Sequence, residues 1–263
     1  MNRLTTKEDW ESRWNPEIIL DIRFSPDRPF FREIHRTLQE YLPSATLNTF
    51  LEIGAYPGRF LWYFHHYFNL DPWGVEYVES LAEGLEKNLS GIDVPGKVIC
   101  EDLFNLAPRQ FGTTLGWDVV ASFGFIEHFI DTREVIRKHF ELTREGGLVI
   151  VTIPNHAGLN GRIMRLVDQD KWEEHNLNSL EDLLVSFREV KDCEILEAKY
   201  VTRIGFWNAC IYRKMKDNLG FLYPIFRAPL WLIEVIGQYL MPNNKFTSPG
   251  ILIIARKENH KSH

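Results

Sequence analysis

The sequence predicts an α/β protein with a mostly parallel sheet that helices cover on both faces. Two observations lead to this fold class. Short apolar runs alternate with segments of helical pattern, which is typical of parallel strands joined by helices. Several of these runs end in an acidic residue or a glycine, as expected where strands approach a ligand. At 263 residues, the chain is long enough for one such domain with insertions.

The first predicted strand leads into a glycine turn. An apolar run, residues 49–51, reaches Glu52, then come Gly54 and Gly58, and an aromatic helical segment starts at Phe60. Glycine lacks a Cβ atom, so its backbone can approach a ligand closely and adopt unusual dihedral angles. The helix N-terminus beyond the turn offers unpaired N–H groups. This stretch therefore predicts a site for a nucleotide-like ligand, although it matches neither the three-glycine dinucleotide fingerprint nor the P-loop.

The second predicted strand, residues 72–78, carries an acid that suits a ribose. Glu76 lies 18 residues beyond Gly58. This is near the ~20-residue spacing at which an acid receives ribose hydroxyls in βαβ nucleotide sites. An ionised carboxylate only accepts hydrogen bonds, so it can take two hydroxyl protons. We therefore expect Glu76 to contact a sugar.

Five further strands complete the predicted sheet. The third ends before Glu101-Asp102-Leu103, the fourth leads through Ser122 and Phe123 to Glu127-His128, and the fifth follows a helix that ends in the pair Gly146-Gly147. The expected strand segments are residues 96–100, 117–123, 146–155, 193–203 and 250–256. Because ligands bind at the carboxyl ends of parallel strands, the residues that follow the first four strands are expected to meet in one site.

Together these motifs resemble class I S-adenosylmethionine (SAM)-dependent methyltransferases of the small-molecule type, in an uncharacterised bacterial branch. The resemblance rests on the pattern E-x-G-x-x-x-G-x-F from Glu52, on the acids after the second and third strands, and on the segment from Trp117-Asp118 to Glu127-His128. It covers roughly residues 45–204 and 250–256. It implies a Rossmann-like seven-stranded methyltransferase fold with an antiparallel last strand. It also implies SAM as the cofactor.

The resemblance assigns roles to individual residues. Glu76 would hold the ribose hydroxyls, Asp102 would accept the adenine amino group, and Leu103 would pack on the adenine ring. The carboxylate of Glu52 suits the positive charges of SAM. The expected cofactor-binding set is Glu52, Gly54, Gly58, Glu76, Asp102, Leu103, Ser122 and Phe123.

The candidates for catalysis are Glu127, His128 and His175, and His156 is a further histidine in the same loop region. Histidine titrates near neutral pH and can act as a general base. The alternatives are structural: Glu127 and His128 would fix the loop after the fourth strand, and His175 would only precede a helix. That helix start is explained by the capping pattern of Ser179 with Asp182. Methyl transfer needs a base only if the acceptor is a weakly acidic hydroxyl or a protonated amine.

Three segments outside the core are expected to determine the acceptor: the N-terminal arm, residues 155–178, which directly follow the fifth strand, and an insertion at residues 205–249. Residues 1–44 form a helical arm or cap in which Trp10 and Trp14 share one helix face, either over the ligand or packed on the core. Residues 205–249 form an aromatic-rich insertion, which is a lid over a partly apolar acceptor, a homodimer face or a peripheral membrane contact. Pro224 and Pro229 interrupt its apolar run, so we expect no transmembrane span there. Residues 45–204 form the SAM-binding core, and residues 250–263 hold the last strand and a polar tail.

Composition narrows the function further. A net charge of −6 argues against a nucleic-acid partner. The three cysteines are far apart and suggest neither a metal site nor disulfides. With no apolar signal region at the N-terminus, we expect a cytoplasmic enzyme. The predicted function is methyl transfer to an oxygen or nitrogen of a sugar, lipid or secondary metabolite. The alternatives are a non-catalytic SAM-fold partner subunit and an NAD-type oxidoreductase.

Overall fold

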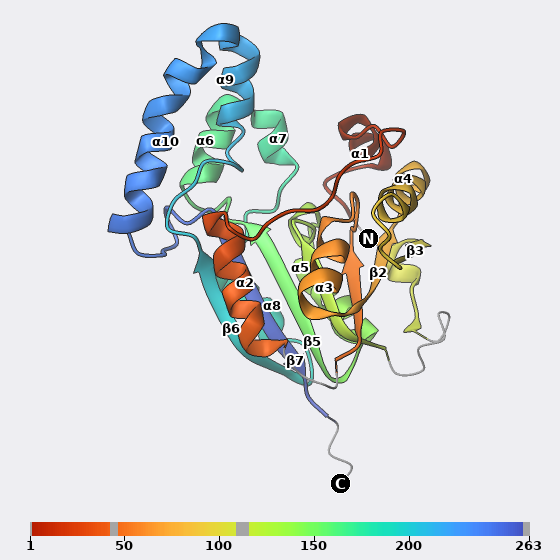
Figure 1. Cartoon of the computed structure of the whole chain (residues 1–263). Coiled ribbons are helices and arrows are strands. Elements are labelled where there is room, and N and C mark those ends of the chain that lie inside the picture. Colours follow the sequence, from red (N-terminus) through yellow and green to blue (C-terminus); the bar gives the residue numbers. More distant parts are fainter. Residues whose placement is uncertain (1, 43–46, 109–115, 260–263) are drawn as a thin grey trace.

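A seven-stranded sheet organises the computed structural model, which describes residues 2–42, 47–108 and 116–259 (Figure 1). The strand order is β3-β2-β1-β4-β5-β7-β6. β7 runs antiparallel to both of its neighbours, and the other pairs are parallel. The predicted sheet is therefore confirmed, while the expected boundary between residues 44 and 45 lies outside the described residues. The strands are β1 (Thr49–Ile53), β2 (Asp71–Glu76), β3 (Lys97–Cys100), β4 (Trp117–Phe123), β5 (Thr143–Pro154), β6 (Cys193–Val201) and β7 (Gly250–Lys257).

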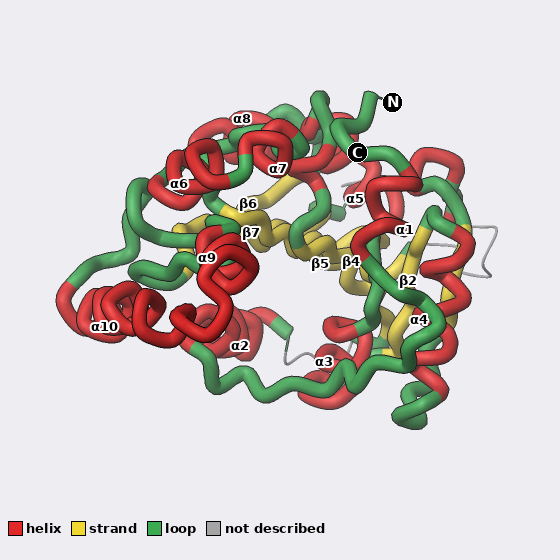
Figure 2. Tube along the Cα trace, turned by 90° about the horizontal axis from the view of Figure 1, so that it is seen from above, coloured by secondary structure: helices red, strands yellow, loops and turns green. Residues whose placement is uncertain are grey.

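Helices cover the sheet on both faces, as Figure 2 shows from above. Along β5, Leu148 and Ile150 face one helix layer, and Val149 and Val151 face the other. This alternation with a period of two buries both sides of the strand. The layer against Leu148 consists of α2 (Pro29–Tyr41), α3 (Arg59–Phe68) and α4 (Glu79–Ser90), and the opposite layer consists of α5 (Thr132–Leu142) and α8 (Leu180–Arg188). Because α2 belongs to a core layer, the N-terminal arm proper is the chain before it.

The strand order reverses between β1 and β4, and this places the site. β2 and β3 follow on one side of β1, and β4 and β5 follow on the other. In open α/β sheets, the crevice at such a switch point lies at the carboxyl ends of the strands. The residues that leave β1, β2, β3 and β4 therefore meet at one edge of the sheet.

The pair Gly146-Gly147 was expected to end the helix before the fifth strand, but it lies inside β5. α5 ends at Leu142, and β5 already begins at Thr143. A Cβ atom at Gly147 would lie 2.8 Å from the main-chain oxygen of Asp118, where the pairing of β4 with β5 shifts register. The glycines thus allow close approach of two strands at an irregularity.

The segments outside the core stand at the edge where the strands end (Figure 1). They include α1 (Lys7–Arg13), α6 (Leu159–Val167), α7 (Gln169–Glu173) and the hairpin of α9 (Ile211–Leu219) and α10 (Tyr223–Leu240). The predicted Ser179–Asp182 capping box is present at the start of the core helix α8. Within the described residues, single turns of 3₁₀ helix lie at η1 (Leu103–Asn105), η3 (Ile126–His128) and η4 (Gly220–Leu222).

The prolines do not break the insertion, which corrects the expectation from sequence. α10 is continuous over 18 residues, with Pro224 in its first turn and Pro229 inside it. A proline in the first turn costs no hydrogen bond, because that N–H has no partner inside the helix. By length and composition alone, Ile211–Leu240 contains a stretch apolar enough to cross a membrane, with a mean hydropathy of 1.5 over its 18-residue window.

Candidate cofactor and acceptor site

A cavity of about 250 Å³ opens at the carboxyl edge of the sheet, at the switch point. Residues from the ends of β1, β2 and β4, from the chain after β3, and from the N-terminal arm line it. Of the residues expected to bind the cofactor, Gly54, Glu76, Leu103 and Phe123 are in this lining. The full lining is Arg3, Trp10, Trp14, Ile53, Gly54, Tyr56, Val75, Glu76, Tyr77, Leu81, Glu101, Leu103, Phe123, Gly124 and Phe125.

Gly54 forms a part of the cavity wall that no side chain can replace without cost. Its φ angle is +72°, a conformation that L-residues rarely adopt. A Cβ atom there would lie 2.6 Å from Cδ2 of Phe125. Gly58 has a φ angle of +101° and directly precedes α3 as its N-cap, but it faces Leu85 and Ile22, so its role is in packing the turn.

Glu76 ends β2 as a buried carboxylate in the cavity wall. Only 6% of the residue is exposed. Its Oε1 accepts a hydrogen bond from the main-chain N–H of Val78 at 3.1 Å. Burial raises the pKa of Glu76, and hydrogen bonds from main-chain N–H groups oppose this shift. The side chain is therefore held in place by the backbone beside the space where a ligand would lie.

Asp102 is engaged by the N-terminal arm, which the sequence did not predict. Its Oδ2 lies 2.8 Å from a guanidinium nitrogen of Arg3, and its Oδ1 accepts from the N–H of Phe104 at 3.0 Å. Glu101 and Leu103 line the cavity, and Asp102 does not. The expected contact of Asp102 with adenine stays a prediction, and it requires the amino group to compete with Arg3.

Two other expected cofactor residues are not part of the cavity lining. Ser122 is fully buried, and its hydroxyl lies 3.0 Å from Nε2 of His139 on α5. We therefore no longer expect a cofactor contact from its side chain. Glu52 is also buried outside the lining, and its Oε2 has no hydrogen-bond partner in the described part of the chain. Burial raises the pKa of Glu52 well above its usual range.

The N-terminal arm closes the cavity. Trp10 and Trp14 both line it, which agrees with the first of the two alternatives considered from their spacing. The main-chain N–H of Leu4 donates to the carbonyl of His128 at 2.8 Å, and the Trp10 ring contacts the His128 ring edge-on with centroids 5.0 Å apart. The arm therefore binds the loop after β4 through main-chain and aromatic contacts.

Arg3, Tyr77 and Phe125 also line the cavity but were not predicted from the sequence. The guanidinium of Arg3 lies over the Tyr77 ring, 4.3 Å from its centroid. A single arginine two residues from the N-terminus carries no pattern that predicts such a contact. Tyr77 directly follows Glu76, so the strand-end rule itself was a signal for it.

Three histidines gather next to the cavity. The rings of His128 and His175 have centroids 4.8 Å apart, and those of His156 and His175 are 4.5 Å apart. His128 also contacts Trp10, which lines the cavity. The structure thus brings together His128 and His175, which lie far apart in sequence, and adds His156.

The histidines are neutral, with defined tautomers at two of them. Nδ1 of His128 faces the carbonyl of Glu174 at 3.0 Å, and Nδ1 of His175 faces the carbonyl of Lys171 at 2.7 Å. A carbonyl only accepts, so both Nδ1 atoms carry the proton and both Nε2 atoms are left as acceptors. Burial lowers the pKa of all three rings, to about 3 for His156. The three rings are therefore uncharged at neutral pH and are weaker bases than a solvent-exposed histidine.

Glu127 is buried beneath this loop and is protonated near neutral pH. Its main-chain carbonyl accepts from the N–H of Asn176, which ties the loop after β4 to the chain after α7. Its Oε2 is buried and has no partner among the described residues. Burial raises the pKa of Glu127 to about 8. The geometry is compatible with the structural alternative for this residue, since it does not line the cavity.

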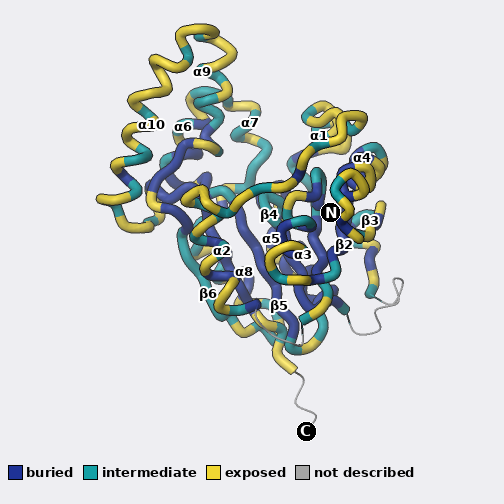
Figure 3. Tube along the Cα trace, viewed as in Figure 1, coloured by how far each residue is buried: buried dark blue, intermediate teal, exposed yellow. Residues whose placement is uncertain are grey.

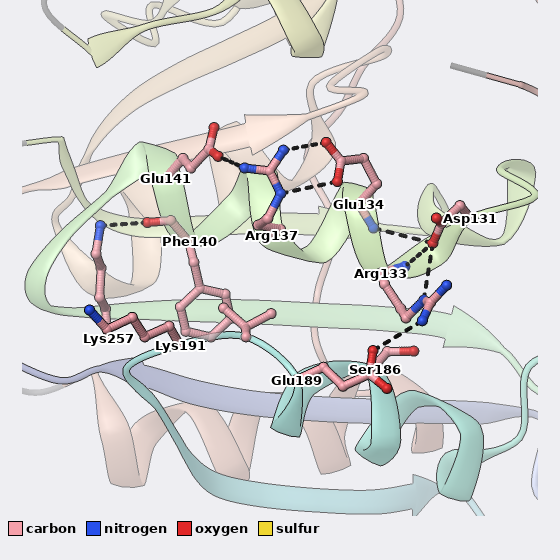
Figure 4. Close-up of a pocket in the computed structure, with 11 residues that line it drawn as sticks. Asp131, Arg133, Glu134, Arg137, Phe140, Glu141, Ser186, Glu189, Lys191 and Lys257 are labelled. Carbon is pink, nitrogen blue, oxygen red and sulfur yellow. Dashed lines mark hydrogen bonds and ion pairs between the residues drawn. The ribbon is translucent and has the colours of Figure 1, made fainter.

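A second hollow lies on the opposite helix layer, between α5, α8 and β7 (Figure 4). Its charges neutralise one another: Arg137 pairs with Glu134 and Glu141, and Arg133 pairs with Glu189. None of the predicted cofactor residues is among those that line it. We therefore assign the site to the cavity at the strand ends. Within the described residues, no cluster of acidic, histidine and cysteine side chains is arranged to hold a metal ion.

Comparisons with known proteins place the chain by fold and family. A family model described as a methyltransferase domain matches residues 26–189. A search of curated protein sequences gave no match. Many solved structures are similar in fold. One is a chain from the complex of the Haloferax volcanii Trm112 methyltransferase activator with a protein assigned as a methyltransferase. It is 11% identical over 97% of both chains, with a TM-score of 0.59.

Two further structures of this fold contain small molecules. One is Haemonchus contortus phosphoethanolamine N-methyltransferase 2 in complex with phosphomonomethylethanolamine and S-adenosylhomocysteine. The two proteins are 16% identical, the match covers 97% of this chain and 61% of that one, and the TM-score is 0.59. Geranyl diphosphate C-methyltransferase from Streptomyces coelicolor, in complex with geranyl diphosphate and S-adenosylhomocysteine, is 12% identical, with 84% and 76% covered and a TM-score of 0.56. At these identities the likeness shows the fold alone.

Proposed function

The chain belongs to the class I SAM-dependent methyltransferases, and on that premise we propose that it transfers a methyl group from SAM to an oxygen or nitrogen of a small, partly apolar acceptor. The observation that carries the proposal is the cavity at the switch point, with the buried Glu76 carboxylate in its wall. The sugars, lipids and secondary metabolites considered from the sequence remain the acceptor classes.

The residues around the cavity suit the parts of SAM. Glu76 is acceptor-only when ionised and is fixed by the Val78 N–H, so it can receive ribose hydroxyls. Gly54 leaves space where a Cβ atom would intrude. The apolar and aromatic side chains of Leu81, Leu103 and Phe123 suit a planar base.

The size of the cavity implies that the arm moves. Its volume of about 250 Å³ is below the ~300–1,000 Å³ typical of ligand pockets. Trp10, Trp14 and Arg3 form the side that belongs to the arm. We expect this side to open when the cofactor enters and to close over it afterwards.

Bound SAM supplies a methyl group that is already activated by its positive sulfur. The protein then has to position the acceptor, exclude water and, for a hydroxyl or ammonium acceptor, remove a proton. Trp10 and the arm shield the cavity from solvent. His128 and His175 keep their protons on Nδ1, so Nε2 is the atom that would take the proton of the acceptor. His128 is the better placed of the two, because it contacts Trp10 in the cavity lining.

Ligand binding tests the proposal first. Titration calorimetry and thermal unfolding with S-adenosylhomocysteine should show binding, and at 100-fold over the dissociation constant the stabilisation is about 2.7 kcal/mol. NADH serves as the control ligand for the oxidoreductase alternative. Absence of binding to SAM and S-adenosylhomocysteine would overturn the proposal. Binding without transfer to any cell metabolite would instead favour the non-catalytic partner subunit.

A further inference from the structure

The hairpin of α9 and α10 projects from the body and is exposed over much of its length (Figures 1 and 3). Many of its exposed residues are large and apolar. Along α10, four apolar residues follow the helical spacing i, i+7, i+11 and i+14 and so lie on one face, and three more flank them. All seven are exposed, and Phe221 at the tip of the hairpin is 89% exposed. We call these eight residues the hairpin surface: Phe221, Ile225, Phe226, Leu232, Ile233, Ile236, Tyr239 and Leu240.

The opposite face of α10 is already used to hold the hairpin on the body. Gly237 is buried, and a Cβ atom there would lie 2.5 Å from Ile204. Glu234, the only acid of α10, accepts from the N–H of Phe206 at 2.6 Å and from the hydroxyl of Tyr212 at 2.8 Å. The hairpin is therefore anchored in a fixed orientation that turns its apolar face outward. A helix this apolar is normally buried, so the hairpin surface is expected to have an occupant.

Charge distinguishes the hairpin from the rest of the protein. Residues 205–249 contain five Lys or Arg and two Asp or Glu, a net charge of +3, whereas the whole chain carries −6. Lys216 and Arg227 are exposed on the hairpin, and Arg213 is exposed but paired with Asp168. Two copies joined through this face would bring patches of the same sign together, which is unfavourable. An anionic surface is complementary to it.

We propose that the hairpin surface docks on a lipid bilayer with anionic headgroups. Apolar and aromatic residues bordered by basic residues are the composition of helices that lie in the membrane interface. Tyr239 is exposed there and suits the headgroup level. The 18 residues of α10 span about 27 Å, yet the helix lies on the interface and does not cross it, because Glu234 and Gly237 bind it to the body.

The position of the hairpin links this surface to the acceptor, a step that rests on the proposed function. The hairpin rises from the edge of the sheet where the cavity opens (Figure 1). It is attached to the α6–α7 junction by ion pairs of Arg213 and Lys214 with Asp168. The two ends of the α6–α7 segment carry His156 and His175, next to the cavity. Docking therefore brings the site close to the lipid surface, and the acceptor is a molecule held in that surface.

Co-sedimentation with vesicles tests the docking. The full-length protein should pellet with vesicles of phosphatidylcholine and phosphatidylglycerol, less with phosphatidylcholine alone, and less at high salt. The double variant Leu232→Glu/Ile236→Glu should bind the vesicles at least about tenfold more weakly than the parent. The matched control is Ile130→Glu/Val185→Glu, at two exposed apolar residues near the α5 and α8 layer, and it should bind like the parent.

Three outcomes would overturn the docking. The first is a parent that stays in the supernatant with both kinds of vesicle. The second is a control variant that loses binding as much as the hairpin variant. The third is a parent that is dimeric by light scattering without vesicles and becomes monomeric in the Leu232→Glu/Ile236→Glu variant, because the surface would then join two copies of this chain.

Two further measurements separate this inference from the proposed function. All variants are titrated with S-adenosylhomocysteine. Vesicle binding without ligand binding would contradict the proposed function and leave the docking intact. Ligand binding without vesicle binding would contradict the docking and leave the proposed function intact. Methyl-labelled SAM is then incubated with the protein and a lipid extract of the expressing cells. Label in the organic phase is the expected result, and label confined to water-soluble products would overturn the assignment of a lipid-held acceptor.

Discussion

Glu76 is the residue on which the cofactor assignment depends most, and Glu76→Ala tests it directly. In the folded protein its carboxylate is buried in the cavity wall and accepts one hydrogen bond from the Val78 N–H at 3.1 Å. Removing it takes away the group expected to hold the ribose hydroxyls. A hydrogen bond to a charged group contributes about 1.5–3 kcal/mol. The dissociation constant of Glu76→Ala for the cofactor should therefore be roughly 10- to 150-fold larger than that of the parent.

The same substitution also affects stability, so the two effects must be measured separately. Loss of the carboxylate leaves the buried N–H of Val78 without its partner, which costs about 1–3 kcal/mol. Thermal unfolding without ligand reports this loss, and calorimetric titration with S-adenosylhomocysteine well below the melting temperature reports affinity. Glu76→Gln keeps the shape and one acceptor oxygen and should lie between the parent and Glu76→Ala.

The matched control is Glu79→Ala, at an exposed glutamate three residues further along at the start of α4. It removes the same charge outside the cavity lining, so the affinity for S-adenosylhomocysteine should stay close to that of the parent. If Glu76→Ala binds the ligand as tightly as Glu79→Ala does, Glu76 does not hold the ribose. The placement of the cofactor along β2 is then wrong.

Three other predictions address the cavity wall, the loop after β4 and the insertion. Gly54→Ala should destabilise the fold by about 1–2 kcal/mol in thermal unfolding, because residue 54 has a positive φ angle. It should also weaken binding of S-adenosylhomocysteine in calorimetry, because the added Cβ atom would meet Phe125. Burial raises the pKa of Glu127 from 4.5 to about 8 in the folded protein. Its favourable contribution to the free energy of unfolding is therefore present in full below pH 4.5 and is lost as the pH rises to 8. Urea unfolding should therefore find Glu127→Gln increasingly more stable than the parent above pH 4.5, and a constant difference at every pH would contradict this. Replacing residues 210–241 by a flexible linker should leave affinity for S-adenosylhomocysteine unchanged, because no residue of the cavity lining lies there, and it should abolish transfer to the acceptor.

The sheet was predictable from sequence because its rules are local and repeated. Each buried strand is an apolar run, and the residue that leaves it, such as Glu76 after β2, lies at the ligand edge in every parallel α/β sheet. Ser122 shows the limit of this rule. Successive side chains of a strand point to opposite faces, and the hydroxyl of Ser122 pairs with His139 while Phe123 lines the cavity. An error of one residue therefore separates a ligand contact from a core contact.

Contacts between distant segments were not predictable in the same way. The ion pair of Arg3 with Asp102 joins residues 99 positions apart, and nothing in either local sequence specifies it. The cluster of His128, His156 and His175 likewise depends on how α6 and α7 fold back over the loop after β4. The prolines of the insertion were expected to interrupt its apolar run, but α10 contains both of them: Pro224 occupies the first turn, where it is tolerated, and Pro229 lies inside the helix.

The closure of the cavity by the first residues of the chain has a practical consequence for making the protein. Arg3 lines the cavity, and its guanidinium is paired with Asp102, so any peptide fused ahead of it would begin beside the ligand. A purification tag in that position would compete with the arm for the opening and would distort every affinity measured for the cofactor. β7 runs opposite to its neighbours and ends at Lys257, at the edge of the sheet farthest from the cavity (Figure 1). Affinity tags, fluorophores and surface-immobilisation handles should therefore be attached after the C-terminal end of β7.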